Sequence, residues 1–413
     1  MSNIDLDYQR YLGANLSLDL TRGKPCPDQL DLSHGLEDMI QGDYRSRDGV
    51  DTRNYGGLAG IPEARELGAR LLDLDPEQVM AGGNSSLSLM YQYLSFRQRQ
   101  WAPSEAAPKF ICLVPGYDRH FSVCEHLGIA MINVALTAQG PDLSMIESLV
   151  QKDPLIHGIW CVPKHSNPTG HIYSPETVQR LARLPLLTQS DFTVMWDNAY
   201  AAHDLHDDVP ALDNLMAHAV SAGTEDQIAI FGSTSKITLA GAGLGFCGLS
   251  PTILAAFQGY LEPQTIGFDK VNQLRHARLL KDDNTLKALM DAHRKILRPK
   301  FDLVDEKLKP LGDQSLASWS LPLGGYFVSL DLTAASARQV VHLAGEAGVK
   351  LTPAGATFPY GNDPEDKNIR IAPSFPDMMD LSQALDVLVC CIQKASHDAA
   401  STPHYEPSKI PIR

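Results

Sequence analysis

The sequence predicts a three-layer α/β fold, in which a large domain with a mostly parallel sheet is joined to a smaller α+β domain. Two observations predict the large domain: its apolar runs are short and continuous, as in strands buried on both faces, and they alternate with helical patterns. A third observation predicts the small domain, because after about residue 298 the pattern changes to strand, turn and strand, followed by helices. The chain of 413 residues is also too long for one compact core.

The large domain is expected over residues 48–298. Its candidate strands are the apolar runs at 110–114, 158–162, 192–196, 227–231 and 243–248. Its candidate helices are 62–72, 86–99, 175–182, 251–261 and a long helix over 270–296.

The small domain is expected to combine residues 1–47 with residues 299–413. Its C-terminal part is predicted to contain strand, turn and strand over 316–330, a helix over 337–347, short strands near 349–351 and 369–371, and a last helix over 379–394. Roughly the first 45 residues are predicted to be irregular and to pack on this C-terminal part.

Composition excludes some classes of protein. A net charge of −14 argues against a nucleic-acid partner, which needs a basic face. Seven cysteines without CxxC spacing predict neither a disulfide framework nor a metal site, and they suit a reducing compartment. No signal peptide and no membrane-spanning segment are expected, so the prediction is a cytoplasmic protein.

Four of the predicted strands lead into residues that can carry chemistry. In chain order these residues are Tyr117, Asn167, Asp197 with Tyr200, and Lys236. Each alone is weak evidence, since a single lysine is usually a surface charge and a single aspartate is usually a turn or cap residue. Ligands of open α/β sheets bind beyond the carboxyl ends of the strands, so one site could collect all five.

This set of side chains is what pyridoxal 5′-phosphate (PLP) requires. Its aldehyde needs a desolvated amine, its ring nitrogen needs a buried carboxylate, and its ring oxygen needs hydrogen-bond donors. Its flat ring suits an aromatic partner. Its phosphate suits hydroxyls at a helix start, such as Ser85 and Ser86 in Gly82-Gly83-Asn84-Ser85-Ser86, although a plain helix cap is the simpler reading of that segment alone.

The sequence resembles the fold-type I PLP enzymes, specifically class I aminotransferases. The resemblance runs from Tyr55 to Arg370 and rests on Asn167-Pro168-Thr169-Gly170, Asp197-x-x-Tyr200 and Ser233-x-Ser235-Lys236. It is strongest for a divergent bacterial aspartate aminotransferase subgroup related to the aminotransferase-like domain of the MocR regulators. The segments that carry this closer resemblance are residues 20–25, 163–170 and 264–267.

The resemblance implies a role for each matching residue. Lys236 corresponds to the Schiff-base lysine that also moves a proton, Asp197 to the partner of the ring nitrogen, and Tyr117 to the stacking aromatic. These three are the predicted catalytic residues, while Asn167 and Tyr200 correspond to the groups on the ring oxygen. The other predicted cofactor-binding residues are Ser85, Ser86, Ser233 and Ser235 at the phosphate, and Tyr55, which would reach the phosphate of a neighbouring subunit in a homodimer.

One departure from the family pattern affects the phosphate end. The family often has a cation eight residues after the lysine, and Leu244 stands there in this chain. Thr238, Arg275 and Lys270 are the candidates for a replacement group.

The predicted substrate-binding residues are Gly23, Asn167, Arg370 and Lys270. An arginine between apolar strand residues, as Arg370 is, would be costly to bury without an anion, and its planar fork fits a carboxylate. Lys270 stands at the spacing of the cation that binds a side-chain carboxylate from the other subunit, although it could equally be an ordinary first-turn helix residue. Its competitors for that task are Arg22, Lys24, Lys164 and Arg275.

The resemblance therefore implies a PLP-dependent aminotransferase that exchanges an amino group between an L-amino acid, expected to be aspartate, and a 2-oxo acid, expected to be 2-oxoglutarate. No metal is expected. Another PLP reaction on the same scaffold stays open: a β-lyase, a decarboxylase or an alanine–glyoxylate aminotransferase. An effector-sensing regulatory domain is the alternative from another class, and the acidic charge and the early start of the aminotransferase pattern disfavour it.

Overall fold

A computed structural model describes residues 3–137 and 140–401. An eight-stranded sheet in the order β2-β9-β8-β7-β6-β3-β4-β5 forms its centre. Neighbouring strands from β8 to β4 run parallel, and β2, β9 and β5 pair antiparallel with their neighbours. The strands are β2 (Val79–Ala81), β3 (Lys109–Val114), β4 (Ala130–Thr137), β5 (Gly140–Pro141), β6 (Ile156–Cys161), β7 (Thr193–Asp197), β8 (Ile228–Ser233) and β9 (Gly245–Gly248).

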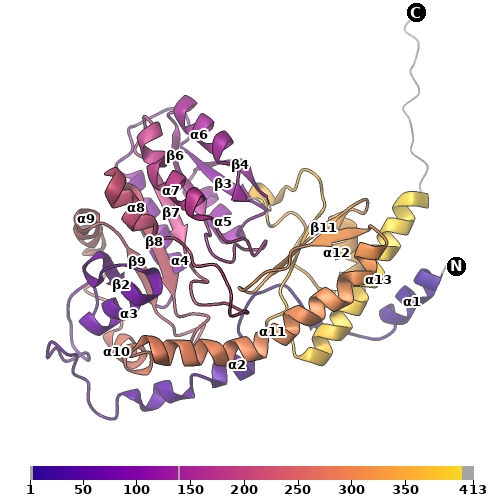
Figure 1. The fold of residues 1–413 in the computed structure, drawn as a ribbon, viewed down its shortest axis with the longest axis horizontal. Helices are drawn as coiled ribbons and strands as arrows, with labels where there is room; N and C mark the ends of the chain where they lie inside the picture. Colours follow the sequence, from indigo (N-terminus) through magenta and orange to yellow (C-terminus); the bar gives the residue numbers. More distant parts are fainter. Residues whose placement is uncertain (1–2, 138–139, 402–413) are drawn as a thin grey trace, which may run out of the picture.

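Helices cover both faces of this sheet, so the large unit has three layers (Figure 1). Along β3 the side chains alternate between two apolar clusters, with Ile111 in one and Phe110 and Cys112 in the other. The first cluster includes side chains of α3 (Pro62–Leu72), α6 (Leu143–Lys152), α7 (Pro175–Arg183), α8 (Leu215–Ala222) and α10 (Lys270–Leu279). The second includes side chains of α4 (Ser86–Gln98), α5 (Asp118–His126) and α9 (Pro251–Leu261).

A second, smaller unit contains a three-stranded antiparallel sheet in the order β10-β11-β13. Its elements are β10 (Ala317–Trp319), β11 (Val328–Leu332), β12 (Val349–Lys350), β13 (Asn368–Ile371), α12 (Ala337–Glu346) and α13 (Met378–Ser401). Helix α11 (Asp283–Asp313) runs from the large unit to the small one along the lower edge of Figure 1.

The N-terminal segment packs on the small unit. Strand β1 (Leu18–Asp19) pairs in parallel with β12, and α1 (Asn3–Leu12) lies against α13 (Figure 1). The hydroxyl of Tyr8 on α1 donates a hydrogen bond to the carbonyl of Leu343. A short helix, α2 (Pro27–Asp31), then leads the chain towards the large unit. The division at residues 47/48 and 298/299 itself stays a prediction, and α11 runs through the second boundary without interruption.

Two sequence predictions were wrong. The helix predicted over 270–296 is two helices, because the chain leaves helical geometry at Leu280 and Asp282 caps a new helix by accepting a hydrogen bond from the Thr285 N–H. The N-terminal segment is not irregular throughout, since α1 is a helix of ten residues. Strand β4 was missed because Asn133 interrupts its apolar run, and β2 was missed because it has only three residues. Within the described residues no helix is long and apolar enough to span a lipid bilayer.

Candidate functional site

A cavity of about 560 Å³ lies between the carboxyl edge of the large sheet and the small unit. Strands β3, β6, β7 and β8 run parallel, so the loops that follow them meet at this edge. The sequence-predicted residues that line the cavity are Gly23, Tyr117, Asn167, Asp197, Tyr200, Lys236 and Arg370. Residues separated by nearly 350 positions in the chain are therefore gathered around one space.

Lys236 follows β8, and its Nζ lies 4.8 Å from the centre of the Tyr200 ring. Burial lowers the pKa of this lysine, and the nearby Asp197 carboxylate opposes that shift. More of the amine is therefore uncharged than in a solvated lysine at the same pH. An uncharged amine is the form that attacks a carbonyl carbon.

Asp197 is the last residue of β7, and only 3% of its surface is exposed. Its Oδ2 lies 2.9 Å from Nε2 of His120, whose ring stacks on Trp160 with centres 4.1 Å apart. Its Oδ1 is buried and has no hydrogen-bond partner among the described residues. A buried carboxylate oxygen without a donor is costly, so the site is suited to a ligand that brings a positively charged or N–H group to this atom.

The two tyrosines of the site are held in their neutral form. Burial raises the pKa of Tyr117, and the neighbouring Asp197 carboxylate raises it further. The pKa of Tyr200 is raised well above its ordinary value by burial and by Tyr117 and Asp197. Both phenols therefore keep their protons at neutral pH and can donate hydrogen bonds to a ligand oxygen.

Arg370 lies in β13 opposite Ser329 of β11, with 7% of its surface exposed. Its Nη1 donates to Asp118 at 2.9 Å and weakly to Asn167 Oδ1 at 3.4 Å. Its guanidinium carbon lies 4.8 Å from the centre of the Phe327 ring. A fixed guanidinium at the wall of a cavity is a binding group for a carboxylate.

Gly23 lies close to the outer edge of the same phenylalanine ring. A Cβ atom at residue 23 would lie 2.5 Å from Cζ of Phe327, so only glycine fits without displacing that ring. The main chain of residue 23 can therefore approach the cavity closely.

The four predicted phosphate-binding serines lie close together but do not line this cavity. The hydroxyl of Ser235 is 3.5 Å from the Asn84 carbonyl, and the Ser235 N–H is 3.3 Å from Ser233 Oγ. Ser85 and Ser86 stand at the start of α4. A Cβ at Gly245 would lie within 2.9 Å of their main-chain atoms, so a glycine there permits this contact between the loops.

Leu244, which stands where the family often has a cation, is buried. Of the three residues considered as its replacement, two form hydrogen bonds within the chain and one is exposed. The Leu244 N–H donates to Thr234 Oγ1. Thr238 Oγ1 is within 2.8 Å of His276 Nε2, and Arg275 is exposed. In the described residues Lys270 Nζ donates to the Phe268 carbonyl.

Tyr55 and Lys270 lie together, outside the cavity of their own chain. Tyr55 is 77% exposed, whereas Lys270 is 5% exposed. The side chain of Lys270 packs so closely on Gly56 that a Cβ there would lie 2.6 Å from Cε.

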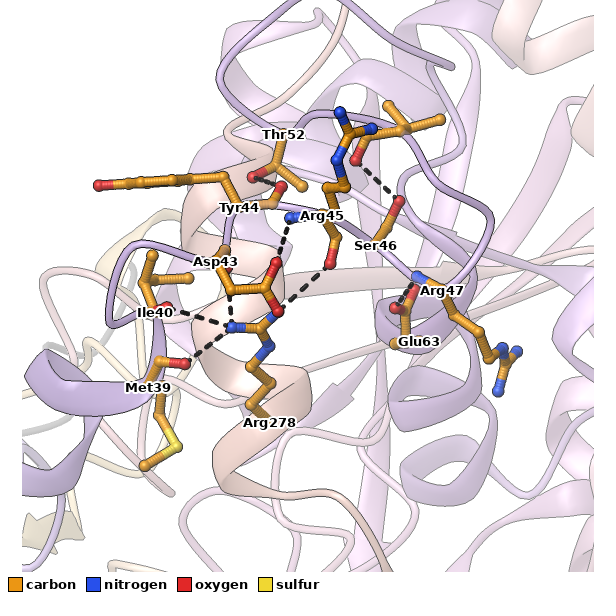
Figure 2. Close-up of polar contacts among 11 residues, drawn as sticks. Met39, Ile40, Asp43, Tyr44, Arg45, Ser46, Arg47, Thr52, Glu63 and Arg278 are labelled. Atoms are coloured by element: carbon orange, nitrogen blue, oxygen red, sulfur yellow. Dashed lines mark hydrogen bonds and ion pairs between the residues drawn. The ribbon is translucent and has the colours of Figure 1, made fainter.

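The chain that leads to Tyr55 is held by the other end of the same helix. Arg278 of α10 donates to the carbonyls of Met39 and Asp43 at 3.0 and 2.9 Å, and to the Asp43 carboxylate at 2.8 Å (Figure 2). The Arg47 N–H binds Glu63 further along the segment. Helix α10 thus fixes the segment 39–57 at both ends.

Sequence reasoning missed several residues that line or support the cavity. The carboxylate of Asp118 accepts a hydrogen bond from Arg370, and the ring of Phe327 packs against the Arg370 guanidinium. The hydroxyl of Thr352 lies 3.4 Å from Nη2 of Arg370. His120 supports Asp197. The only sequence signal for His120 is its position three residues after Tyr117, one helical turn along α5.

Comparisons with known proteins agree with this geometry. The family model for aspartate amino-transferase matches residues 1–404. An aminotransferase of Mycolicibacterium smegmatis is 46% identical over 406 residues, which is 95% of this chain and 94% of the relative. An aspartate aminotransferase of Corynebacterium glutamicum is 43% identical over 392 residues, covering 92% of this chain and 90% of the relative. A crystal structure of an aspartate transaminase from Corynebacterium glutamicum superposes with a TM-score of 0.91 at 41% identity, over 96% of this chain and 95% of that chain.

Proposed function

Because the chain belongs to the aspartate aminotransferase family and is a PLP-dependent aminotransferase, we propose that its amino donor is aspartate and its acceptor 2-oxoglutarate. The observation that supports an α-amino acid as the substrate class is the fixed guanidinium of Arg370 in the same cavity as Lys236. The name of the Corynebacterium glutamicum relative supports aspartate as the donor.

The residues of the cavity fit PLP. The unpaired Oδ1 of Asp197 is suited to the protonated ring nitrogen, and Tyr200 and Asn167 are suited to the ring oxygen. Tyr117 would stack on the ring, and Ser85, Ser86, Ser233 and Ser235 would hold the phosphate. When bound, this cofactor supplies an electron sink that withdraws charge from the substrate Cα.

The chain's own residues supply binding and proton transfer. Arg370 holds the α-carboxylate of the substrate, and the close approach of Gly23 adds a main-chain contact there. Lys236, whose pKa is lowered by burial, takes the proton from the substrate Cα and later returns a proton. Asp197, supported by His120, would pair with the ring nitrogen of the cofactor and so favour its protonated form.

We also propose a homodimer in which Tyr55 and Lys270 complete the partner's site. Their shared position outside the cavity of their own chain and the exposure of Tyr55 support this. Lys270 would bind the side-chain carboxylate of aspartate, and Arg22 and Lys24, which line the cavity of this chain, are its competitors. The free thiol state of all seven cysteines supports a cytoplasmic location.

Single half-reactions test the donor. Holoenzyme is mixed rapidly with one amino acid at a time, and the loss of the visible absorbance of the lysine-bound cofactor is followed. Aspartate should react with the highest second-order rate constant, and the Lys236→Ala variant should lack both the band and the reaction. A clear preference for alanine or aromatic donors would overturn aspartate as the substrate, and release of ammonia or carbon dioxide would indicate a lyase or decarboxylase.

A further inference from the structure

Three side chains converge on the main chain of the reactive lysine. The Lys236 carbonyl lies 3.3 Å from Nε2 of His203 and 3.3 Å from the hydroxyl of Tyr326. The next carbonyl, that of Ile237, lies 2.8 Å from Nε2 of His293. Within the described residues, no main-chain N–H donates to either carbonyl. The two carbonyls are therefore held by side chains, whereas the N–H groups of Ile237 and Thr238 donate to the Thr234 carbonyl at 2.8 Å.

The hydrogen positions in this network follow from its chemistry. A carbonyl can only accept, so His203 and His293 must both carry their proton on Nε2. His293 Nδ1 is then a bare acceptor, and it receives a hydrogen bond of 3.0 Å from Nε2 of Gln29. The second hydrogen of the same Gln29 amide is donated to the Tyr326 hydroxyl at 2.8 Å. The Tyr326 hydroxyl can therefore donate its own proton to the Lys236 carbonyl. Every donor therefore has one matching acceptor.

Burial keeps the two histidines neutral. The pKa of His203 is lowered to about 3 by burial and by the nearby Lys236, and burial also lowers the pKa of His293. A proton on His293 Nδ1 would also face the Gln29 amide donor. The two imidazoles thus keep the same hydrogen-bonding form throughout the neutral pH range.

The network joins parts of the chain that are far apart in sequence. His203 follows β7, His293 lies in α11, Gln29 lies in α2, and Tyr326 precedes β11. The rings of His203 and Tyr326 pack edge to face with centres 5.7 Å apart, and both lie beside Tyr200. Its members therefore come from the large unit, the connecting helix, the N-terminal segment and the small unit.

We propose that His203, Tyr326 and His293, braced by Gln29, are positioning residues that fix the main chain of Lys236 and so set the reach and orientation of its amine. The proposal rests on Lys236 being the cofactor-bound lysine. Backbone anchoring matters at this position because the amine stands at the end of a long, flexible side chain that must first hold the cofactor and then reach the substrate Cα.

Four variants test the proposal in the holoenzyme. Tyr326→Phe removes one donor to Lys236 and keeps the ring. His203→Phe removes the other donor, whereas His203→Gln keeps an amide N–H near the position of Nε2. The control is Tyr8→Phe, because Tyr8 is a buried tyrosine that also donates to a main-chain carbonyl, that of Leu343, but lies in the small unit away from the cavity. Thermal unfolding of each variant reports the loss of stability separately.

The decisive measurement is the pH titration of the visible absorbance of the lysine-bound cofactor, which reports the environment of the Lys236 nitrogen. Tyr326→Phe and His203→Phe should each move the midpoint by about half a pH unit or more and lower kcat roughly tenfold with little change in KM. His203→Gln should restore most of the midpoint and of kcat. Tyr8→Phe should lower the thermal stability but leave the midpoint and kcat unchanged.

Unchanged midpoints and unchanged kcat in Tyr326→Phe and His203→Phe would overturn the proposal. The same conclusion would follow if Tyr8→Phe moved the midpoint as much as they do. If His203→Phe does not fold, Tyr326→Phe decides alone. The proposed function fails separately, because its own test is whether Lys236→Ala loses the absorbance band altogether.

Discussion

The carboxylate of Asp118 lies 2.9 Å from Nη1 of Arg370, the arginine that we propose as the binder of the substrate α-carboxylate. Arg370 is almost fully buried, whereas about a third of the Asp118 side chain is exposed. A substrate carboxylate bound at Arg370 would therefore share its guanidinium with Asp118. Two like charges at one cation repel each other, so Asp118 would weaken substrate binding unless it moved towards solvent.

Removing this charge is expected to tighten substrate binding. Asp118→Asn should lower KM for the amino donor by about 3- to 10-fold, a range that allows for screening of a partly exposed charge. Steady-state kinetics at low and high salt measures this, with a smaller difference between variant and wild type at high salt. Asp283→Asn, another first-turn aspartate that is exposed and distant from the cavity, serves as the control. A higher KM would mean that Asp118 instead orients Arg370 for the substrate.

Arg370→Lys is expected to lower kcat/KM for every α-amino acid by roughly 100-fold. An ammonium cannot form the two parallel hydrogen bonds that a guanidinium forms with a carboxylate. Steady-state kinetics with several donors measures the effect. Arg338→Lys, in which an exposed arginine of α12 changes in the same way, should be unaffected. A loss confined to dicarboxylic substrates would instead assign Arg370 to the side-chain carboxylate.

His120→Phe is expected to weaken cofactor binding by about 10- to 100-fold. It removes the one hydrogen-bond partner of the Asp197 carboxylate among the described residues and leaves that charge buried and unpaired. Fluorescence titration of the apoenzyme with PLP measures the affinity. His157→Phe is a matched control, because His157 is also buried and also stacks on a tryptophan, Trp101, with ring centres 4.3 Å apart. Equal losses in the two variants would mean that only packing is affected.

Lys236→Met is expected to stabilise the apoenzyme at neutral pH. The folded-state pKa of Lys236 lies below its ordinary value of 10.5, so between the two values the unfolded chain binds more protons, and stability rises with pH. The burial of the charged amine lowers the free energy of unfolding by its full amount at pH values below the folded-state pKa of Lys236. This loss of stability disappears above about pH 10.5, where the amine is uncharged in both states.

The melting temperature of the Lys236→Met apoenzyme should therefore exceed that of the wild-type apoenzyme by roughly 2 °C or more at pH 7, and the difference should disappear at alkaline pH. Lys300→Met is the contrast. Lys300 is buried but donates to the carbonyls of Ser374 and Pro376, so its loss should destabilise the protein. A Lys236→Met apoenzyme that melts below wild type at pH 7 would contradict the expected cost of the buried amine.

Subunit mixing tests the proposed shared site. A heterodimer of Lys236→Ala and Tyr55→Ala subunits contains one intact site, because the intact Lys236 and the intact Tyr55 meet across the interface. Denaturing and refolding an equal mixture should recover about a quarter of wild-type activity. Mixing Lys236→Ala with Arg370→Lys should recover almost none, because both residues line the same cavity of one chain. Equal recovery in the two mixtures would exclude a Tyr55 contribution to the partner's site.

The sequence predicted most of the buried strands of the large sheet to within a few residues. Strands β3, β6, β7 and β8 are continuous apolar runs because helices cover both sides. The prediction failed at β4, where Asn133 interrupts the apolar run, and at β2, which is buried but only three residues long. The break at Leu280 was missed because helical spacing of apolar residues continues on both sides of it.

What the sequence by itself determined is the set of residues at the carboxyl ends of the strands. Strand direction places Tyr117, Asn167, Asp197 and Lys236 at one edge of a parallel sheet, so their spacing in the chain was enough to predict a common cavity.

Only the tertiary structure decided which groups support them. His120 reaches Asp197, Asp118 reaches Arg370, and His203, His293 and Tyr326 reach the main chain at Lys236. These contacts join segments that are as much as 252 positions apart, as for Asp118 and Arg370. Hydrogen bonds depend on distances of a few tenths of an ångström, which packing of the helices and sheets sets and residue spacing in the chain does not.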